Sequence, residues 1–177
     1  MAQAAATQEK MRNIRAIALD VDGVLTDGGM WWGADGEEFK RFSFSDIMGI
    51  SLARRQGFLV ALISGESSPL VDRYAAKLMI ADVAKGCRDK SAALRDFAQR
   101  NGLQLSEICF IGDDVNDLAA MEIAGLSAAP SDARAAVLER VGFVAASRGG
   151  NGAVREVIEA LLAAHGTSAE IVYRESV

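Results

Sequence analysis

The sequence predicts an α/β protein with a doubly wound parallel sheet and an inserted β-hairpin. Short, continuous apolar runs recur along the chain, which is typical of strands buried on both faces of a parallel sheet. Amphipathic stretches with helical spacing separate these runs, and this alternation favours helices on both sides of the sheet. Acidic and small polar residues directly follow several runs, where sites in such sheets lie. The chain has 177 residues, half of them hydrophobic, and fits one domain with a substantial core.

Six strands and six helices account for most of the chain. The apolar runs that we interpret as strands are 14–19, 58–63, 78–83, 108–111, the weaker 125–129, and 142–145. The helical patterns are 47–55, 69–77, 90–101, 117–124, 132–140 and 153–164. We place the domain at residues 13–166. Residues 1–12 lack the features of a signal peptide and are expected to form a flexible arm. Residues 167–177 lack clear periodicity, so we expect a tail that is disordered or docks on a neighbour.

One segment, residues 28–45, breaks the alternation of strands and helices. Its part from 30 to 44 has the pattern of a β-hairpin that turns at residues 33–36, with Phe42 and Phe44 on one face. The adjacent Trp31 and Trp32 must point to opposite faces of this hairpin. Either the core covers one face and another subunit the other, or one tryptophan is partly exposed. The segment is too short for a separate cap domain.

The composition excludes several classes of partner. The formal net charge is −5 and the chain has no basic block, so nucleic acid is not an expected partner. No apolar stretch is long enough to span a bilayer. Cys87 and Cys109 do not suggest a disulfide framework, and Cys109 lies within an apolar run. We therefore expect a cytoplasmic protein that binds neither nucleic acid nor membranes.

The most informative motif is the run 20–27, DVDGVLTD, which follows the first predicted strand. Asp20 and Asp22 are two residues apart, so in extended backbone their carboxylates face the same way and repel each other. A divalent cation offsets this repulsion, and Mg²⁺ prefers such hard oxygen ligands. One carboxylate can then attack phosphorus while the other acts as acid and base, and Gly23 permits a sharp turn. The alternative is an ordinary turn at a strand end.

Two further strand and helix ends carry polar groups that suit a phosphate. Ser64 follows the strand 58–63, and its hydroxyl can donate to a phosphate oxygen, while Gly65 allows close approach of the backbone. Lys90 stands at a helix start, an unfavourable place for a cation unless an anion lies beside it. Taken alone, Ser64 is more often a turn or cap residue, and Lys90 a solvated lysine.

A second acidic run, 111–117 (IGDDVND), follows the strand 108–111. Of its carboxylates, Asp113, Asp114 and Asp117, one can complete the coordination of Mg²⁺ and the others can orient the lysine or water near the metal. Ordinary helix capping explains Asp117 well but leaves the rest of the run unexplained.

The four motifs, in this order, resemble those of the haloacid-dehalogenase-like phosphatase superfamily, whose fold is of the Rossmann type. The resemblance implies a Mg²⁺-dependent phosphatase with Asp20 as nucleophile and Asp22 as general acid and then base. It implies that Asp20, the backbone carbonyl of Asp22, and Asp113 hold Mg²⁺. Ser64 and Lys90 would hold the transferring phosphoryl group.

Residues 28–30, 45–50 and 148–156 narrow the resemblance to the capless branch that acts on phosphorylated keto-sugar acids. That branch includes phosphatases of octulosonate 8-phosphate and of nine-carbon 9-phosphates. It implies a homotetramer in which hairpins pack together and a neighbouring subunit completes the active site. The residues that we assign to the substrate are Gly23, Asp46, Gly65, Glu66, Arg148 and Arg155. For Arg148 and Arg155 the alternative is a glycine-rich connection followed by a solvated arginine.

Two departures bear on the substrate. The octulosonate enzymes usually carry Asp-Gly-x-Gly where this chain has Asp46-Ile47-Met48-Gly49, and Thr-Gly-Arg where it has Ser64-Gly65-Glu66. Glu66 favours a nine-carbon substrate of the KDN or sialic acid 9-phosphate type, because an anion replaces a cation beside an anionic substrate. The eight-carbon 8-phosphate is the alternative, in which Glu66 only favours the following helix start. A receiver-like phosphoacceptor module is a more distant alternative.

Overall fold

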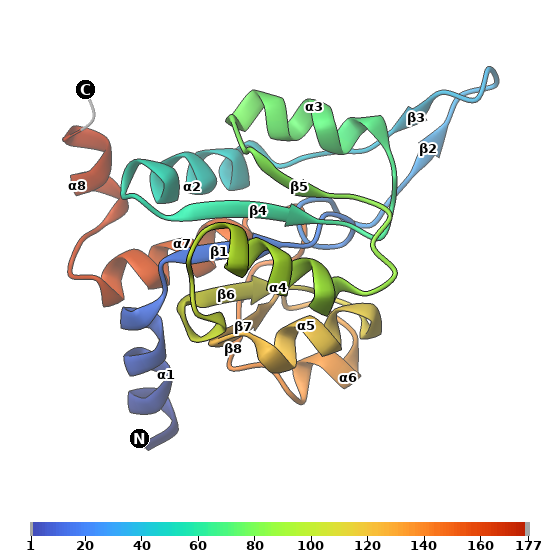
Figure 1. Ribbon diagram of the computed structural model, residues 1–177. Coiled ribbons are helices and arrows are strands. Elements are labelled where there is room, and N and C mark those ends of the chain that lie inside the picture. Colours follow the sequence, from blue (N-terminus) through green and yellow to red (C-terminus); the bar gives the residue numbers. More distant parts are fainter. Residues whose placement is uncertain (1, 176–177) are drawn as a thin grey trace.

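The computed structural model describes residues 2–175 and confirms a doubly wound parallel sheet (Figure 1). The six parallel strands lie in the order β5-β4-β1-β6-β7-β8. In chain order they are β1 (Ala16–Leu19), β4 (Leu59–Ile63), β5 (Asp82–Ala84), β6 (Ile108–Ile111), β7 (Leu126–Ala129) and β8 (Phe143–Val144). The central strand β1 pairs with β4 through Leu19 and Leu62, and with β6 through Leu19 and Ile111. The ends of these three strands therefore lie side by side.

Helices cover both faces of the sheet. The first face packs against α1 (Ala2–Asn13), α2 (Phe44–Arg55), α3 (Pro69–Leu78), α7 (Ala153–Ala164) and α8 (Ala169–Arg174). The second packs against α4 (Lys90–Arg100), α5 (Leu118–Ile123) and α6 (Ala135–Leu138). Short 3₁₀ turns, η1 (Leu105–Glu107) and η2 (Val115–Asp117), precede β6 and α5. None of the described helices is both long and apolar enough to cross a membrane.

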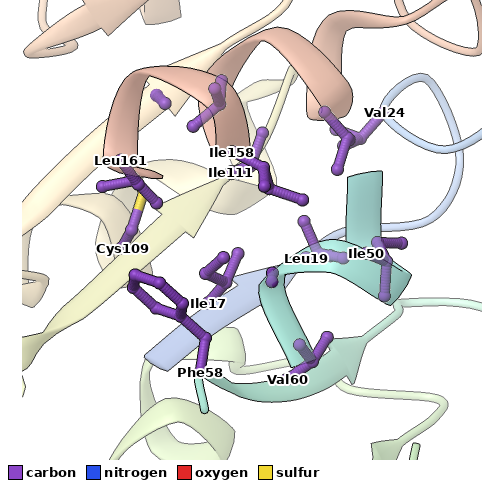
Figure 2. Packing of buried hydrophobic residues seen from close by; sticks show 14 of the residues in the cluster. Ile17, Leu19, Val24, Ile50, Phe58, Val60, Cys109, Ile111, Ile158 and Leu161 are labelled. Atoms are coloured by element: carbon purple, nitrogen blue, oxygen red, sulfur yellow. The ribbon is translucent and has the colours of Figure 1, made fainter. Parts of the chain in front are cut away.

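Alternation along each strand divides the core into two clusters. Ile17 and Leu19 of β1 belong to the larger cluster, whereas Ala16 and Ala18 belong to the one beneath α4 and α5. In Figure 2 the larger cluster joins the sheet to α7 and α2, with Ile17 close to Phe58 and Cys109. Burial of this apolar surface supplies the main favourable free energy of folding. It also fixes the strand ends from which the polar motifs emerge.

The hairpin extends from the body on the side to which the strands point (Figure 1). It consists of β2 (Trp31–Trp32) and β3 (Glu38–Phe39), paired antiparallel, and residues 2–175 contain no separate cap domain. In the isolated chain Trp31 is 54% exposed and Trp32 is 74% exposed. The core therefore buries neither tryptophan. Both sequence-based alternatives expected the core to cover at least one of them, so the hairpin differs from both in this respect.

Several boundaries differ from those predicted. The expected loose arm is the helix α1, whose Met11 is buried, and the expected tail contains α8, whose Val172 is buried. The run 78–83 is not a continuous strand, because Leu78 ends α3 and Met79 takes a left-handed backbone conformation with φ 53°. Helix α2 begins at Phe44, so the hairpin does not extend to that residue.

Candidate active site

Asp20 lies at the carboxyl end of the central strand. Its backbone N–H donates to the carbonyl of Ile111 on β6, and the residue is only 5% exposed. Lys90, the first residue of α4, places Nζ 2.8 Å from Asp20 Oδ1 and 2.7 Å from Asp117 Oδ1. Burial lowers the pKa of Lys90, but the two carboxylates outweigh it and hold the pKa above its ordinary value. The lysine is therefore a fixed cation beside the Asp20 carboxylate, and the expected anionic partners of Lys90 include Asp117.

Asp113 follows β6 and faces Asp20 across the strand ends. Oxygens of Asp20, Asp113 and Asp117 lie within 4.8 Å of one another. Asp117 is already engaged, because Oδ1 meets Lys90 and Oδ2 accepts the N–H groups of Asp113 and Asp114. Oδ1 of Asp113, by contrast, is buried and has no hydrogen-bond partner among residues 2–175. Asp20 uses Oδ1 for Lys90, whereas Asp117 uses both of its oxygens. Asp113 and the second oxygen of Asp20 are therefore the carboxylate groups best placed to bind a cation.

The electrostatics of this cluster fit a divalent cation. Burial, and then the nearby carboxylates of Asp20 and Asp117, raise the pKa of Asp113 to about 7. Burial followed by the charge of Asp117 also raises the pKa of Asp20, against the opposing effect of Lys90. A bound cation would remove this penalty, since it favours the ionised form of each ligand.

Gly23 allows Asp113 to approach the first loop. Its φ is +89°, and a Cβ added there would lie 2.2 Å from Asp113 Oδ2. Gly149 packs equally closely, since an added Cβ would lie 1.8 Å from the carbonyl oxygen of Gly23. Gly23 thus supports the site through its shape, whereas a direct contact of Gly23 with substrate stays a prediction.

Ser64 is buried directly after β4. Its Oγ accepts the N–H of Glu66 at 3.1 Å, which leaves the hydroxyl proton available to donate to a ligand. Gly65 and the exposed Glu66 lie on the wall of a cavity of about 370 Å³. The residues that line this cavity are Asp20, Asp22, Gly65, Glu66, Lys90, Asp113, Asp114 and Asn116. Ser64 does not itself line the cavity, although Gly65, the next residue, does.

Four of the six predicted substrate residues do not line this cavity: Gly23, which supports the site through its shape, and Asp46, Arg148 and Arg155. Asp46 is fully buried, and its carboxylate accepts the N–H groups of Gly152 and Arg155 at 3.1 and 2.9 Å. It thereby ties α2 to the start of α7, and this structural role replaces the predicted contact with substrate. Arg148 pairs with Asp132 at 3.0 Å, and Arg155 pairs with Glu159. Within one chain neither arginine is directed into the cavity of Asp20.

Two residues of the site region were not predicted. Lys40, just after β3, has a side chain that is 1% exposed, and its Nζ lies 2.7 Å from Asp22 Oδ1. Asn116 lines the cavity. Asn116 belongs to the acidic run 111–117, so the position of that motif already indicated that Asn116 lies near the site. Lys40 carries no such signal, because a lysine in a two-stranded hairpin is normally solvated.

A parallel sheet with an aspartate at the end of its central strand, beside a buried lysine and further carboxylates, is the arrangement of a class of hydrolases that transfer a group to aspartate. A profile described as haloacid dehalogenase-like hydrolase matches residues 66–158. The 3-deoxy-D-manno-octulosonate 8-phosphate phosphatase of Escherichia coli strain K12 is 40% identical over 157 residues, 89% of this chain and 84% of that protein. The Haemophilus influenzae protein of the same name is 38% identical over 161 residues, 91% and 89%. The chain belongs to the haloacid dehalogenase-like hydrolase family, and it is a phosphatase.

Solved structures agree with this assignment. The 3-deoxy-D-manno-octulosonate 8-phosphate phosphatase of Moraxella catarrhalis was solved with magnesium, phosphate and KDO. It matches with a TM-score of 0.91 at 34% identity, over 96% of this chain and 97% of that one. A HAD superfamily (subfamily III A) hydrolase from Legionella pneumophila gives 0.94 at 34% identity, over 98% and 97%.

Proposed function

We propose that this phosphatase is a Mg²⁺-dependent phosphomonoester hydrolase that acts on a phosphorylated keto-sugar acid. The observation that carries the proposal is Asp20, held beside Lys90 and facing the unpartnered oxygen of Asp113. The site brings together the carboxylates of Asp20, Asp113 and Asp117 with a single contacting lysine. A dianionic phosphate would be repelled from such a site without a cation. The magnesium and phosphate in the Moraxella relative support this choice of metal.

The residues suit a two-step transfer. In the first step a carboxylate oxygen of Asp20 attacks phosphorus, and the bond from phosphorus to the sugar oxygen breaks. Asp22 gives a proton to the departing oxygen. In the second step Asp22 takes a proton from water, which attacks the aspartyl-phosphate, releases inorganic phosphate and restores Asp20.

Charge neutralisation accompanies both steps. Lys90 and the Ser64 hydroxyl hold the phosphoryl oxygens. Mg²⁺, held by Asp20, the Asp22 carbonyl and Asp113, would neutralise charge on the transferring group. Asp117 fixes Lys90 and the backbone of Asp113, so it acts through those residues.

For the substrate we favour 3-deoxy-D-manno-octulosonate 8-phosphate. The Escherichia coli and Haemophilus influenzae relatives, which match nearly the whole chain, carry this activity in their names. They support the eight-carbon alternative better than the nine-carbon substrate favoured by Glu66 alone. A nine-carbon 9-phosphate remains the second candidate, since Glu66 is an anion on the wall of the cavity. The phosphatase relatives give no support to a receiver-like module.

We further propose a cytoplasmic homotetramer with active sites completed by neighbouring subunits. The exposed tryptophans of the hairpin support the assembly, because a monomer leaves them in water. Arg148 and Arg155, which do not line the cavity of their own chain, could then serve a site shared between subunits. Cys87 and Cys109 are both free thiols, which suits a reducing compartment.

The direct test is phosphate release from a panel of phosphorylated sugar acids. We expect turnover of octulosonate 8-phosphate with Mg²⁺ and its loss after chelation. Asp20→Asn removes the nucleophile but preserves the volume of the side chain, so it should retain the fold and lose turnover. Wild-type-like activity in that variant would reject the aspartyl-phosphate route. Preference for a nine-carbon 9-phosphate would select the second candidate.

A further inference from the structure

Lys40 connects the hairpin to the first catalytic loop. Its side chain is almost completely buried, and Nζ lies 2.7 Å from Asp22 Oδ1. This contact is an ion pair and not a hydrogen bond, because Nζ of Lys40 has no hydrogen-bond partner among the described residues. Burying a lysine costs several kcal/mol unless a counter-charge lies close to it. The Asp22 carboxylate is that counter-charge, so the position of Lys40 and the position of Asp22 depend on each other.

A second contact extends this connection to the loop after β4. Oε1 of Glu38 lies 3.6 Å from Lys40 Nζ and accepts the hydroxyl of Ser68 at 2.7 Å. Ser68 caps α3, where its Oγ also accepts the N–H of Leu70. The second hairpin strand therefore bridges two loops: that of Asp22 and that of Ser64 to Ser68. The hairpin is thus built into the site of a single chain, whatever its role in assembly.

The two oxygens of Asp22 are in different environments. Oδ1 lies against Lys40, whereas Oδ2 is buried and has no hydrogen-bond partner in the part of the chain that the structure describes. Asp22 itself lines the cavity. An ion pair at one oxygen restricts rotation of the carboxylate and leaves the other oxygen available to carry a proton. We propose that Lys40 is a positioning residue that orients Asp22 for proton transfer to the departing sugar oxygen.

This inference rests on the proposed phosphatase function, and the nature of the leaving group tests it. An alkoxide from a sugar phosphate is a poor leaving group and requires a proton from Asp22. Nitrophenolate is weakly basic and leaves from p-nitrophenyl phosphate without one. General acid catalysis typically contributes about 10²–10⁴-fold. Loss of orientation should remove part of that factor for the sugar phosphate and little for the aryl phosphate.

The experiment compares Lys40→Met with wild type on both substrates, with saturating Mg²⁺. We expect kcat/KM for the sugar phosphate to fall about 10–100-fold, and that for p-nitrophenyl phosphate to change less than about threefold. The ratio of the two values is independent of the fraction of folded enzyme, and Lys40→Gln provides a second variant. Lys85→Met is the matched control, because Lys85 pairs with Asp72, neither residue lines the cavity, and the change should leave the ratio unchanged.

A double variant separates positioning from other effects. In the Asp22→Asn background, Lys40→Met should cause no further loss with the sugar phosphate. Equal losses on both substrates, or a full further loss in that background, would show that Lys40 supports only the fold, and would overturn the inference while the phosphatase function stands. A wild-type enzyme that hydrolyses neither substrate would overturn the proposed function, and this inference with it.

Discussion

Asp113 links metal binding to pH. Its folded-state pKa of about 7 lies above its ordinary value of 3.8, because burial and the neighbouring carboxylates disfavour the charge. The contribution of this group to stability is therefore full below pH 3.8 and is lost as the pH rises through about 7. A cation binds the ionised form and reverses the loss. We expect Mg²⁺ to raise the free energy of unfolding more near pH 8 than near pH 5, as measured by urea unfolding.

Matched variants identify the group responsible for that dependence. Asp113→Asn should weaken the dependence of the Mg²⁺ effect on pH and leave only the part due to Asp20, whose pKa is also raised. Asp35→Asn, at the exposed tip of the hairpin, should retain the full dependence. An equal stabilisation by Mg²⁺ at both pH values in wild type would contradict a role for Asp113 as a ligand with a raised pKa.

Glu66 permits a test of substrate choice at a single residue. It lies on the cavity wall, directly after the Ser64-Gly65 pair. Glu66→Arg should favour octulosonate 8-phosphate over a nine-carbon 9-phosphate by about 1–3 kcal/mol in relative kcat/KM, because a cation there can pair with an anionic substrate. Glu122→Arg makes the same change of charge on α5 and serves as the control. If Glu66→Arg leaves the ratio of kcat/KM for the two substrates unaltered, Glu66 does not select the substrate and only favours the start of the following helix.

The sequence predicted the grouping of Asp20, Lys90 and Asp113, because each directly follows a strand or begins a helix at the same edge of the sheet. It did not predict the roles of Lys40 and Asp46. Burial of Lys40 depends on how the hairpin folds back towards Asp22. The partners of Asp46 are Gly152 and Arg155, more than a hundred residues away, and no local pattern encodes such a contact.

At the scale of elements, helix α2 packs closely on helix α7, and Asp46 also ties the two helices together. A Cβ added at Gly49 would lie 2.9 Å from the Cα of Arg155, a contact with backbone that cannot simply rotate away. Gly49→Ala gains up to about 1 kcal/mol of helix propensity, but overpacking typically costs about 1–3 kcal/mol. We expect a net loss in the free energy of unfolding by urea. Ser51→Ala, at a partly exposed position of α2, is the control. A higher free energy of unfolding for Gly49→Ala than for wild type would show that α2 and α7 can move apart without cost.

The differences between predicted and observed elements share a physical cause. The run 78–83 is apolar throughout, but hydrophobicity cannot distinguish the last turn of a helix from a buried strand. The left-handed Met79 separates the two elements. Helices α1 and α8 have weak sequence patterns of their own. They are placed by tertiary contacts, such as those that bury Met11 and Val172.

At the scale of the whole molecule, the hairpin projects from the side of the sheet where the strands end (Figure 1). The cavity is lined by residues that follow these strand ends, so it lies on the same side. The large exposed apolar side chains of this region are Met30, Trp31, Trp32, Phe39 and Phe44. So much apolar surface is unusual on a monomer and supports the proposal that another copy covers this surface. The alternating pattern of the sequence required Trp31 and Trp32 to face opposite ways, but it could not show that the core reaches neither.

Assembly through the hairpin gives the last prediction. Sedimentation of the wild type at micromolar concentration should show a species of about four times the chain mass of 18.8 kDa. Replacing both tryptophans by serine removes apolar area that burial stabilises by about 25 cal/mol per Å², so that variant should sediment as smaller species. Ile171→Ser, which alters a 46%-exposed side chain on α8, should leave the assembly intact. If the wild type sediments as a monomer, neighbouring subunits cannot complete the site, and Arg148 and Arg155 have no part in binding substrate.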